Sequence, residues 1–286
     1  MATARRCFYY SFSKVALFSK SLAVLPARPL PVLLTLGIWK SKPTSPEETV
    51  PEKSLEERIV QQADELYSRD DTVGLYELLI KYKDVQNDEI LWRLARAACD
   101  KGKLSANPND RKACMYEAFE YIKKALAAND QNFAVHKWYA ILLDYTGEYE
   151  GTKQRISNAF IVKEHLLKAI ELNQKDATSM YSLGYWCFLF ADMPWYQRQV
   201  ASVIFTSPPT SSYEEALKYF LQAEETDPNF YSTNLLMLGK TYLRLKQNDL
   251  AVQYLKRARD YPVRKPDDRE AHKEAVELLK SLGSSD

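Results

Sequence analysis

The stretch LLMLGKTYLRLKQNDLAVQYLKRA, residues 235–258, decides the fold of this chain. Apolar and small side chains recur at helical spacing on both sides of its polar segment KQND, which predicts two antiparallel helices joined by a short turn. Gly239 and Ala251 are small because the two helices cross closely there, and Tyr242 fills the space beside them. Each of these residue types therefore has a packing reason.

The same pattern recurs upstream, as expected of an array of tetratricopeptide units. In the preceding unit Gly184 and Ala216 lie 32 positions apart, against 12 for Gly239 and Ala251, so about 20 residues are inserted between its helices. Two units further upstream carry inserts of about 8 and about 10 residues. The positions to which we assign structural roles are Gly184, Ala216, Pro228, Gly239, Tyr242, Ala251 and Ala258.

A weaker helix pair, residues 55–67 and 73–82, opens the array, and a last helix near residues 267–279 has the apolar face that a terminal cap needs. We count four to five helical pairs. The predicted fold is an all-α, tetratricopeptide-like solenoid of helical hairpins, with inserts inside the repeats and a C-terminal capping helix.

The composition agrees with a mostly helical protein. Of 286 residues only 8 are Gly, while 19 Tyr, 11 Phe and 5 Trp supply side chains that fill the gaps between helices. The 4 Cys share no short spacing, so neither a zinc ribbon nor a disulfide framework is indicated, and a reducing compartment is favoured.

The N-terminal segment differs in kind from the rest. Residues 1–46 hold seven Lys or Arg and no acid, and five apolar side chains fall on one face of a helix: Phe8, Phe12, Val15, Phe18 and Leu22. This pattern is typical of a mitochondrial presequence. A disordered basic tail and a membrane anchor are the alternatives, although the apolar run 30–39 is too short to span a bilayer.

Residues 40–54 hold three Pro among polar residues, which is typical of a linker. We therefore divide the chain into a basic targeting or disordered segment with its linker, residues 1–54, and a repeat domain, residues 55–286.

Local basic groups crowd the last repeat, although the chain after residue 46 is net acidic and offers no general attraction to nucleic acid. Such a patch predicts a site for an acidic partner, and the alternative is a merely solvated helix face. The candidate residues are Arg244, Lys246, Lys256, Arg257 and Arg259, with Arg264 and Lys265 beside them and a smaller group at Lys153 and Arg155.

Motifs for catalysis are not found. The triplet 239–241 ends like a phosphate-binding loop, but Asn234 stands where its first Gly is needed. The histidines His136, His165 and His272 are scattered and lack the spacing of metal ligands. We expect no catalytic residue, no metal site and no cofactor, and therefore a binding protein rather than an enzyme.

The first helix of each pair normally lines the concave face of such a solenoid, where a peptide or helix binds. Inserts that fold across this face would convert it into a closed aromatic pocket. The candidate wall residues are Trp186, Phe188, Trp195 and Tyr196, and the alternative is that they belong to the core.

Five segments resemble the regulator of microtubule dynamics family: LWRLARA (91–97), HKWYAILL (136–143), KEHLLKAIELN (163–173), MPWYQR (193–198) and SYEEALKYFLQAEETDPNFY (212–231). The resemblance covers residues 55–265, includes the inserts, and is greater to the first, shorter family member than to the longer ones. It implies a non-catalytic protein of microtubules and the mitotic spindle, with some members at mitochondria and a longer member bridging mitochondria to endoplasmic reticulum. Gln174 departs from the family's usual Pro.

Two functions remain open from these observations. In the first, a microtubule- and spindle-associated protein of the cytoplasm, cytoskeleton and spindle poles binds the acidic tails of tubulin through its basic patch. In the second, a mitochondrial scaffold or tether addressed by residues 1–46 holds a lipid or an apolar helical peptide in its pocket.

Overall fold

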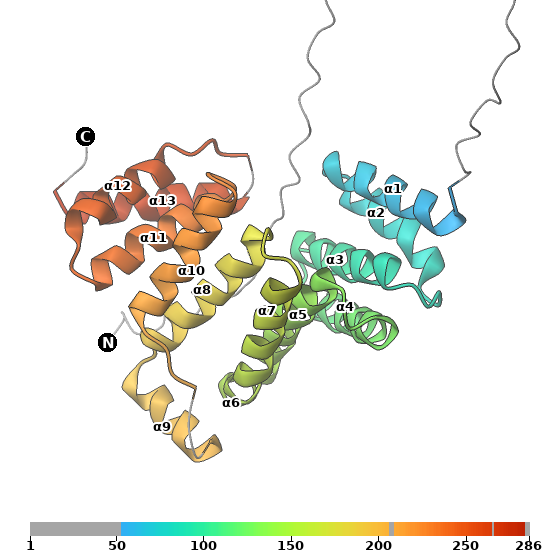
Figure 1. The fold of residues 1–286 in the computed structure, drawn as a ribbon, viewed down its shortest axis with the longest axis horizontal. Coiled ribbons are helices and arrows are strands. Elements are labelled where there is room, and N and C mark those ends of the chain that lie inside the picture. The colour runs from blue at the N-terminus through green and yellow to red at the C-terminus, as the bar shows by residue number, and fades with distance from the viewer. Residues whose placement is uncertain (1–52, 206–208, 265, 284–286) are drawn as a thin grey trace, which may run out of the picture.

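The computed structural model describes residues 53–205, 209–264 and 266–283. The predicted targeting segment, the membrane-anchor alternative and nearly all of the predicted linker lie outside these described residues. Every regular element within them is a helix, which confirms the all-α class (Figure 1).

The helices form five antiparallel pairs that follow one another along the array, with a final helix at the C-terminal end (Figure 1). This arrangement confirms the predicted solenoid of helical hairpins and its capping helix. The pairs are α1 (Leu55–Ser68) with α2 (Thr72–Leu79) and the 3-10 turn η1 (Ile80–Tyr82), α3 (Asp88–Leu104) with α4 (Pro108–Ala128), α5 (Phe133–Glu150) with α7 (Ala159–Leu172), α8 (Ala177–Ala191) with α10 (Tyr213–Thr226), and α11 (Ser232–Arg244) with α12 (Asn248–Arg259), capped by α13 (Pro266–Ser281).

Local sequence decides where most of these helices begin. A short polar side chain accepts a hydrogen bond from a first-turn amide, which satisfies a backbone donor that the helix itself leaves unpaired. The residues that cap in this way are Ser54, Asp71, Asn87, Asn107, Asn132, Asp176 and Ser212.

Two glycines lie where paired helices approach most closely. A Cβ atom at Gly184 would lie 2.8 Å from Cδ1 of Phe220 and 3.2 Å from the carbonyl oxygen of Ala216. At Gly239 it would lie 2.6 Å from Cγ of Leu255. Both distances are shorter than ordinary van der Waals contact, so any larger residue forces the helices or the facing side chain to shift.

The three inserts lie at the tips of their hairpins. The first only lengthens α3 and α4, the second forms the short helix α6 (Thr152–Ser157), and the third forms α9 (Trp195–Ile204). Helix α9 packs on α6 and projects below α8 and α10 in Figure 1. An insert between the two helices of a hairpin starts and ends at the tip of that hairpin. Helices α6 and α9 therefore extend the edge of the array formed by the hairpin tips, and they do not cross the concave face.

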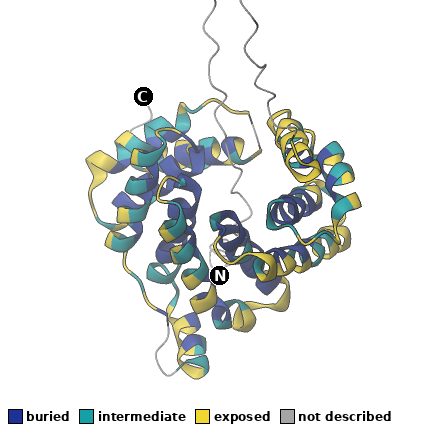
Figure 2. Ribbon diagram, turned by 45° about the vertical axis from the view of Figure 1, so that its right-hand side comes forward, coloured by how far each residue is buried: buried dark blue, intermediate teal, exposed yellow. Residues whose placement is uncertain are grey.

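One apolar core runs from α1 to α12, and a second, smaller core joins α11, α12 and α13. In each pair after the first, the first helix is the more deeply buried one: every residue from Ile90 to Cys99 on α3 and from Ala177 to Phe188 on α8 is buried (Figure 2). Among the described residues, no helix is both long and apolar enough to cross a bilayer.

Candidate partner-binding surfaces

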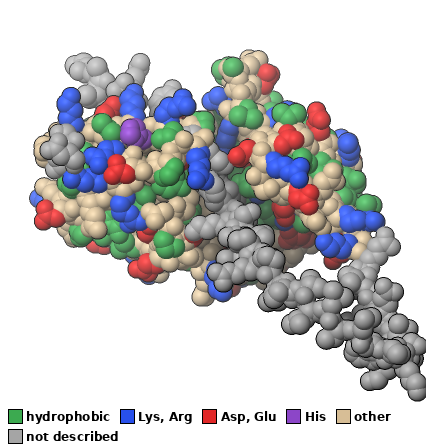
Figure 3. Space-filling view, turned by 90° about the horizontal axis from the view of Figure 1, so that it is seen from above, with side chains coloured by type: hydrophobic (Ala, Val, Ile, Leu, Met, Phe, Trp, Pro, Cys, Tyr) green, Lys and Arg blue, Asp and Glu red, His purple; other side chains and the backbone are tan. Residues whose placement is uncertain are grey.

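The five predicted basic-patch residues divide into two groups. Arg244 and Lys246 lie at the turn between α11 and α12, whereas Lys256, Arg257 and Arg259 occupy the last turn of α12. From its first residue, Asn248, to Lys256, α12 rises roughly 12 Å at 1.5 Å per residue, which separates the two groups. Figure 3 shows Lys and Arg side chains gathered on the side of the molecule that α12 and α13 occupy, with Asp and Glu between them.

Three of these five cations are held by carboxylates of the chain itself. Arg244 makes two hydrogen bonds to Asp192, of 2.7 and 3.1 Å. Arg257 pairs with Glu224, and Arg259 Nε lies 2.7 Å from an oxygen of Asp260.

The other two cations differ. Among the described residues, Lys246 and Lys256 form no ion pair with any carboxylate. Lys246 is exposed and Lys256 is half-buried. The positive charge offered to a partner on this side is therefore smaller than the sequence indicates, and we call Lys246 and Lys256 the free lysines.

The smaller predicted group at Lys153 and Arg155 is divided in the same way. Arg155 lies at the end of α6 and makes two hydrogen bonds, of 2.7 and 2.8 Å, to the carboxylate of Asp144 on α5. Both side chains are largely buried, and the carboxylate raises the pKa of Arg155 despite burial, which acts in the other direction. Arg155 therefore ties α6 to α5, and only Lys153 is exposed.

The four candidate pocket aromatics do not come together. Trp186 and Phe188 belong to the core of α8, and the indole N–H of Trp186 donates to the carbonyl of Ala159 at 3.1 Å. Trp195 and Tyr196 lie on α9 and are 76% and 46% exposed. Two of the four therefore have the packing role given as the alternative, and the other two face away from the core.

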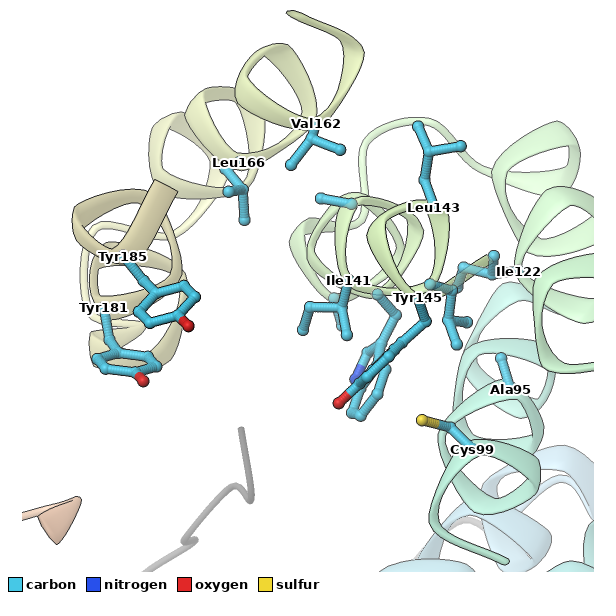
Figure 4. Close-up of a cluster of buried hydrophobic side chains, with 14 of the residues drawn as sticks. Ala95, Cys99, Ile122, Ile141, Leu143, Tyr145, Val162, Leu166, Tyr181 and Tyr185 are labelled. Carbon is cyan, nitrogen blue, oxygen red and sulfur yellow. The ribbon is translucent and has the colours of Figure 1, made fainter. Parts of the chain in front are cut away.

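The sides of α3, α5 and α8 that face away from α4, α7 and α10 form what we call the inner face. Figure 4 shows Cys99, Tyr145, Tyr181 and Tyr185 directed from these three helices toward the same space. Burial raises the pKa of Tyr145, Tyr181 and Tyr185 well above that of a free phenol, so these hydroxyls stay protonated.

Three cations near the inner face have carboxylate partners. Lys137 lies 3.1 Å from Asp176, the cap of α8, and Lys103 lies 3.3 Å from Asp100. The third, Arg93, makes two hydrogen bonds of 2.8 Å to Asp64 of α1 and also pairs with Glu89.

Arg96 is different. Its guanidinium stacks on the ring of Tyr67 at 3.6 Å and lies 5.0 Å from that of Trp92, but among the described residues its buried Nε and Nη2 atoms have no hydrogen-bond partner. Burial lowers the pKa of Arg96, although an arginine remains charged at neutral pH.

Sequence reasoning did not single out Arg96 or Tyr145. The signal was available for Arg96, because this arginine interrupts the apolar run LARAAC of residues 94–99, where no solvated residue is expected.

Two of the three histidines come together, so the description of them as scattered is wrong. The Nδ1 atoms of His136 and His165 lie 2.9 Å apart, because α5 and α7 are antiparallel partners of one repeat. His136 Nε2 also lies 2.8 Å from the carbonyl oxygen of Asp130. No third ligand joins them, and among the described residues no group of three His, Cys, Asp or Glu side chains could hold a metal ion.

The hairpins, the close crossings at glycine and the capping helix define a helical-repeat protein of the tetratricopeptide class. A solved structure of a tetratricopeptide protein of Thermus thermophilus, TTC0263, matches 78% of this chain and 100% of its own length with a TM-score of 0.56 at 15% identity, which supports the fold alone.

The chain belongs to the family described as regulator of microtubule dynamics proteins 1–3, whose family model matches residues 59–283. Over 227 residues it is 52% identical to regulator of microtubule dynamics protein 1 of Pongo abelii and of Mus musculus, which covers 79% of this chain and 72% and 74% of those proteins. Regulator of microtubule dynamics protein 3 of Xenopus laevis is 36% identical over 225 residues, or 77% of this chain and 49% of that protein.

Proposed function

We propose that this protein is a non-catalytic, spindle-associated regulator of microtubule dynamics that binds the acidic tails of tubulin directly. The observation that carries the proposal is that the free lysines, Lys246 and Lys256, form no ion pair among the described residues, in a chain whose relatives are named regulators of microtubule dynamics. Its place is the cytoplasm, the cytoskeleton and the spindle with its poles.

The mechanism is electrostatic. The tails of tubulin are flexible and negatively charged, so a stiff array that presents the free lysines attracts them over about one Debye length, roughly 8 Å at physiological salt. Arg244, Arg257 and Arg259 contribute less, because a cation already bound to a carboxylate has little charge left to offer. Affinity should therefore fall steeply as salt rises.

The test is co-sedimentation of the full chain with microtubules over a salt series, with intact microtubules and with microtubules whose tails have been removed. We expect binding that weakens with salt and with loss of the tails. Reversing both free lysines, Lys246→Glu with Lys256→Glu, should lower the affinity about tenfold, since each exposed pair contributes roughly 0.5–1 kcal/mol and reversal adds repulsion.

A matched control is Lys83→Glu with Lys175→Glu. These two lysines are exposed, have no ion pair among the described residues and lie near the other end of the array and at its middle. The control changes the net charge by the same amount, so equal losses in both variants would mean a general charge effect and would contradict the assignment to the free lysines. No sedimentation of the unaltered chain would contradict direct binding altogether.

The mitochondrial alternative stays a prediction. It depends on residues 1–46, which lie outside the described residues, and on a pocket that the four chosen aromatics do not form together.

A further inference from the structure

The outer side of α9 is apolar, although this helix lies at the surface. Trp195 is 76% exposed, Tyr196 46% and Val203 86%, and they lie within roughly 100° of one another around the helix. The opposite side carries the buried Gln197 and Ala201. The usual pattern of a surface helix is therefore inverted, because large apolar side chains face solvent while a glutamine is buried.

The apolar surface continues beyond the end of α9. The ring centre of Phe205 lies 5.0 Å from that of Phe160, in the first turn of α7, and the two rings meet edge to face. Phe160 is 44% exposed and its neighbour Ile161 is 43% exposed. Helix α9 is the lowest helix in Figure 1, so this surface lies at the edge formed by the hairpin tips. We call the following residues the apolar tip: Trp195, Tyr196, Val203, Phe160 and Ile161.

The size and shape of the apolar tip favour a membrane over a protein partner. Its five residues expose roughly 600 Å², since a large aromatic side chain alone covers about 150–250 Å². A stable protein–protein interface buries about 800 Å² on each partner. Because α9 projects below α8 and α10, a protein would also have to supply a groove, whereas the fluid boundary layer of a bilayer closes around projecting side chains.

The charge around the apolar tip is positive. Residues 152–161 and 193–205 contain Lys153, Arg155 and Arg198 and no Asp or Glu. Arg155 is bound by Asp144, but Lys153 and Arg198 are exposed and form no ion pair among the described residues. Two cations therefore lie beside the exposed apolar side chains.

The contacts of Arg198 leave its charge in place. Its guanidinium donates to the carbonyl oxygens of Met193 at 3.0 Å and Ala191 at 3.2 Å, which holds the start of α9 without neutralising the cation. Asp192, the acid next to this helix, accepts two hydrogen bonds from Arg244 instead. The surroundings of the apolar tip are therefore complementary to a negatively charged surface.

Tryptophan and tyrosine combine an apolar ring with one polar group, and such side chains prefer the boundary between water and lipid hydrocarbon. We propose that α9 docks the protein on the surface of an anionic membrane. Trp195, Tyr196 and Val203 enter the boundary layer of the bilayer, and Lys153 and Arg198 face its phosphate groups. This docking goes beyond the proposed microtubule function and does not depend on it.

The test is sedimentation of the full chain with phosphatidylcholine vesicles that contain or lack phosphatidylserine. We expect binding to the anionic vesicles that weakens as salt rises. The double variant Trp195→Gln with Val203→Gln should lower the affinity by about tenfold or more, because two exposed apolar side chains no longer leave water. Both positions are exposed, so the melting temperature should stay the same.

A matched control is Leu55→Gln with Val73→Gln. These two residues are 56% and 59% exposed and lie on α1 and α2. The control removes the same number of exposed apolar side chains, so it should bind vesicles as the unaltered chain does. The basic residues 1–46 are present in every variant, and any binding that they cause is common to all of them.

A second measurement reports whether α9 itself enters the bilayer. Vesicles with brominated acyl chains quench the fluorescence of a tryptophan that enters the bilayer, and Trp92, Trp138 and Trp186 are buried in the protein. We expect quenching in the unaltered chain that is reduced in Trp195→Phe.

Four outcomes would overturn the proposal. The first is failure of the full chain to bind anionic vesicles, and the second is equal binding by the Trp195→Gln, Val203→Gln variant. The third is equal quenching in the unaltered chain and in Trp195→Phe. The fourth is self-association of the full chain in sedimentation velocity that the double variant abolishes, which would assign the apolar tip to a second copy of this chain.

Discussion

Replacing Gly184 by Ala should destabilise the protein, although alanine is the better helix former. The substitution places a methyl group 2.8 Å from Cδ1 and 2.9 Å from Cε1 of Phe220, and 3.2 Å from the carbonyl oxygen of Ala216. Phe220 is fully buried between α8 and α10, so its ring cannot move into solvent, and the carbonyl is backbone within α10.

Two opposing effects set the magnitude. Alanine in place of glycine inside a helix contributes about 1 kcal/mol of stability, and overpacking of a close-packed core costs about 1–3 kcal/mol. The free energy of unfolding should therefore fall by roughly 0–2 kcal/mol. We expect a value in the upper half of this range, because the carbonyl oxygen of Ala216 is a backbone atom that cannot move aside as a side chain can. For a chain of this size that corresponds to a decrease in melting temperature of roughly 2–4 °C per kcal/mol.

The measurement is urea unfolding of Gly184→Ala, of Phe220→Leu and of the double variant. Phe220→Leu makes room beside position 184, so the double variant should be more stable than the sum of the two single changes predicts. A gain of about 1 kcal/mol in Gly184→Ala, with additive energies in the double variant, would refute the close helix crossing.

Three further predictions follow from buried polar groups. Burial and the neighbouring histidine lower the pKa of His165 from 6.5 to about 4, so as the pH falls the unfolded chain binds a proton at this histidine before the folded chain does. The free energy of unfolding, measured with urea, should therefore keep its full value above pH 6.5 and decline toward pH 4. The variant His165→Gln should remove this part of the decline. Asp144→Asn leaves the buried guanidinium of Arg155 without its carboxylate and should cost about 3–5 kcal/mol in the same assay, and a loss below about 1 kcal/mol would contradict the ion pair. Burial raises the pKa of Cys99 to about 12, so alkylation mapped by mass spectrometry should reach the half-buried Cys114 before Cys99, which should react only in denaturant.

Much of the fold could be predicted because repeat packing is local. A glycine, an alanine and an aromatic residue at fixed separations describe one helical hairpin, and neighbouring hairpins stack by the same contacts. The positions of Gly184 and Gly239 therefore indicated the helix pairs before any contact was known.

The candidate sites could not be predicted to the same degree, because they depend on contacts between distant residues. Arg257 looked free beside Lys256 in the sequence, yet the hairpin brings it to Glu224, 33 residues earlier. His136 and His165, 29 residues apart, meet for the same reason. Sequence spacing reports neighbours on one helix but not the partner that a second helix supplies.

By itself the sequence determined the helical-repeat class, the order of the pairs and the presence of three inserts, since each depends on the spacing of small and apolar residues along one chain. Only the tertiary structure decided which cations keep their charge available, that α6 and α9 extend the hairpin tips, and that Arg96 and Tyr145 are buried with polar atoms unpaired in the described part of the chain. The physical reason is that charge pairing and burial arise from approach in space, which the local pattern of residues does not encode.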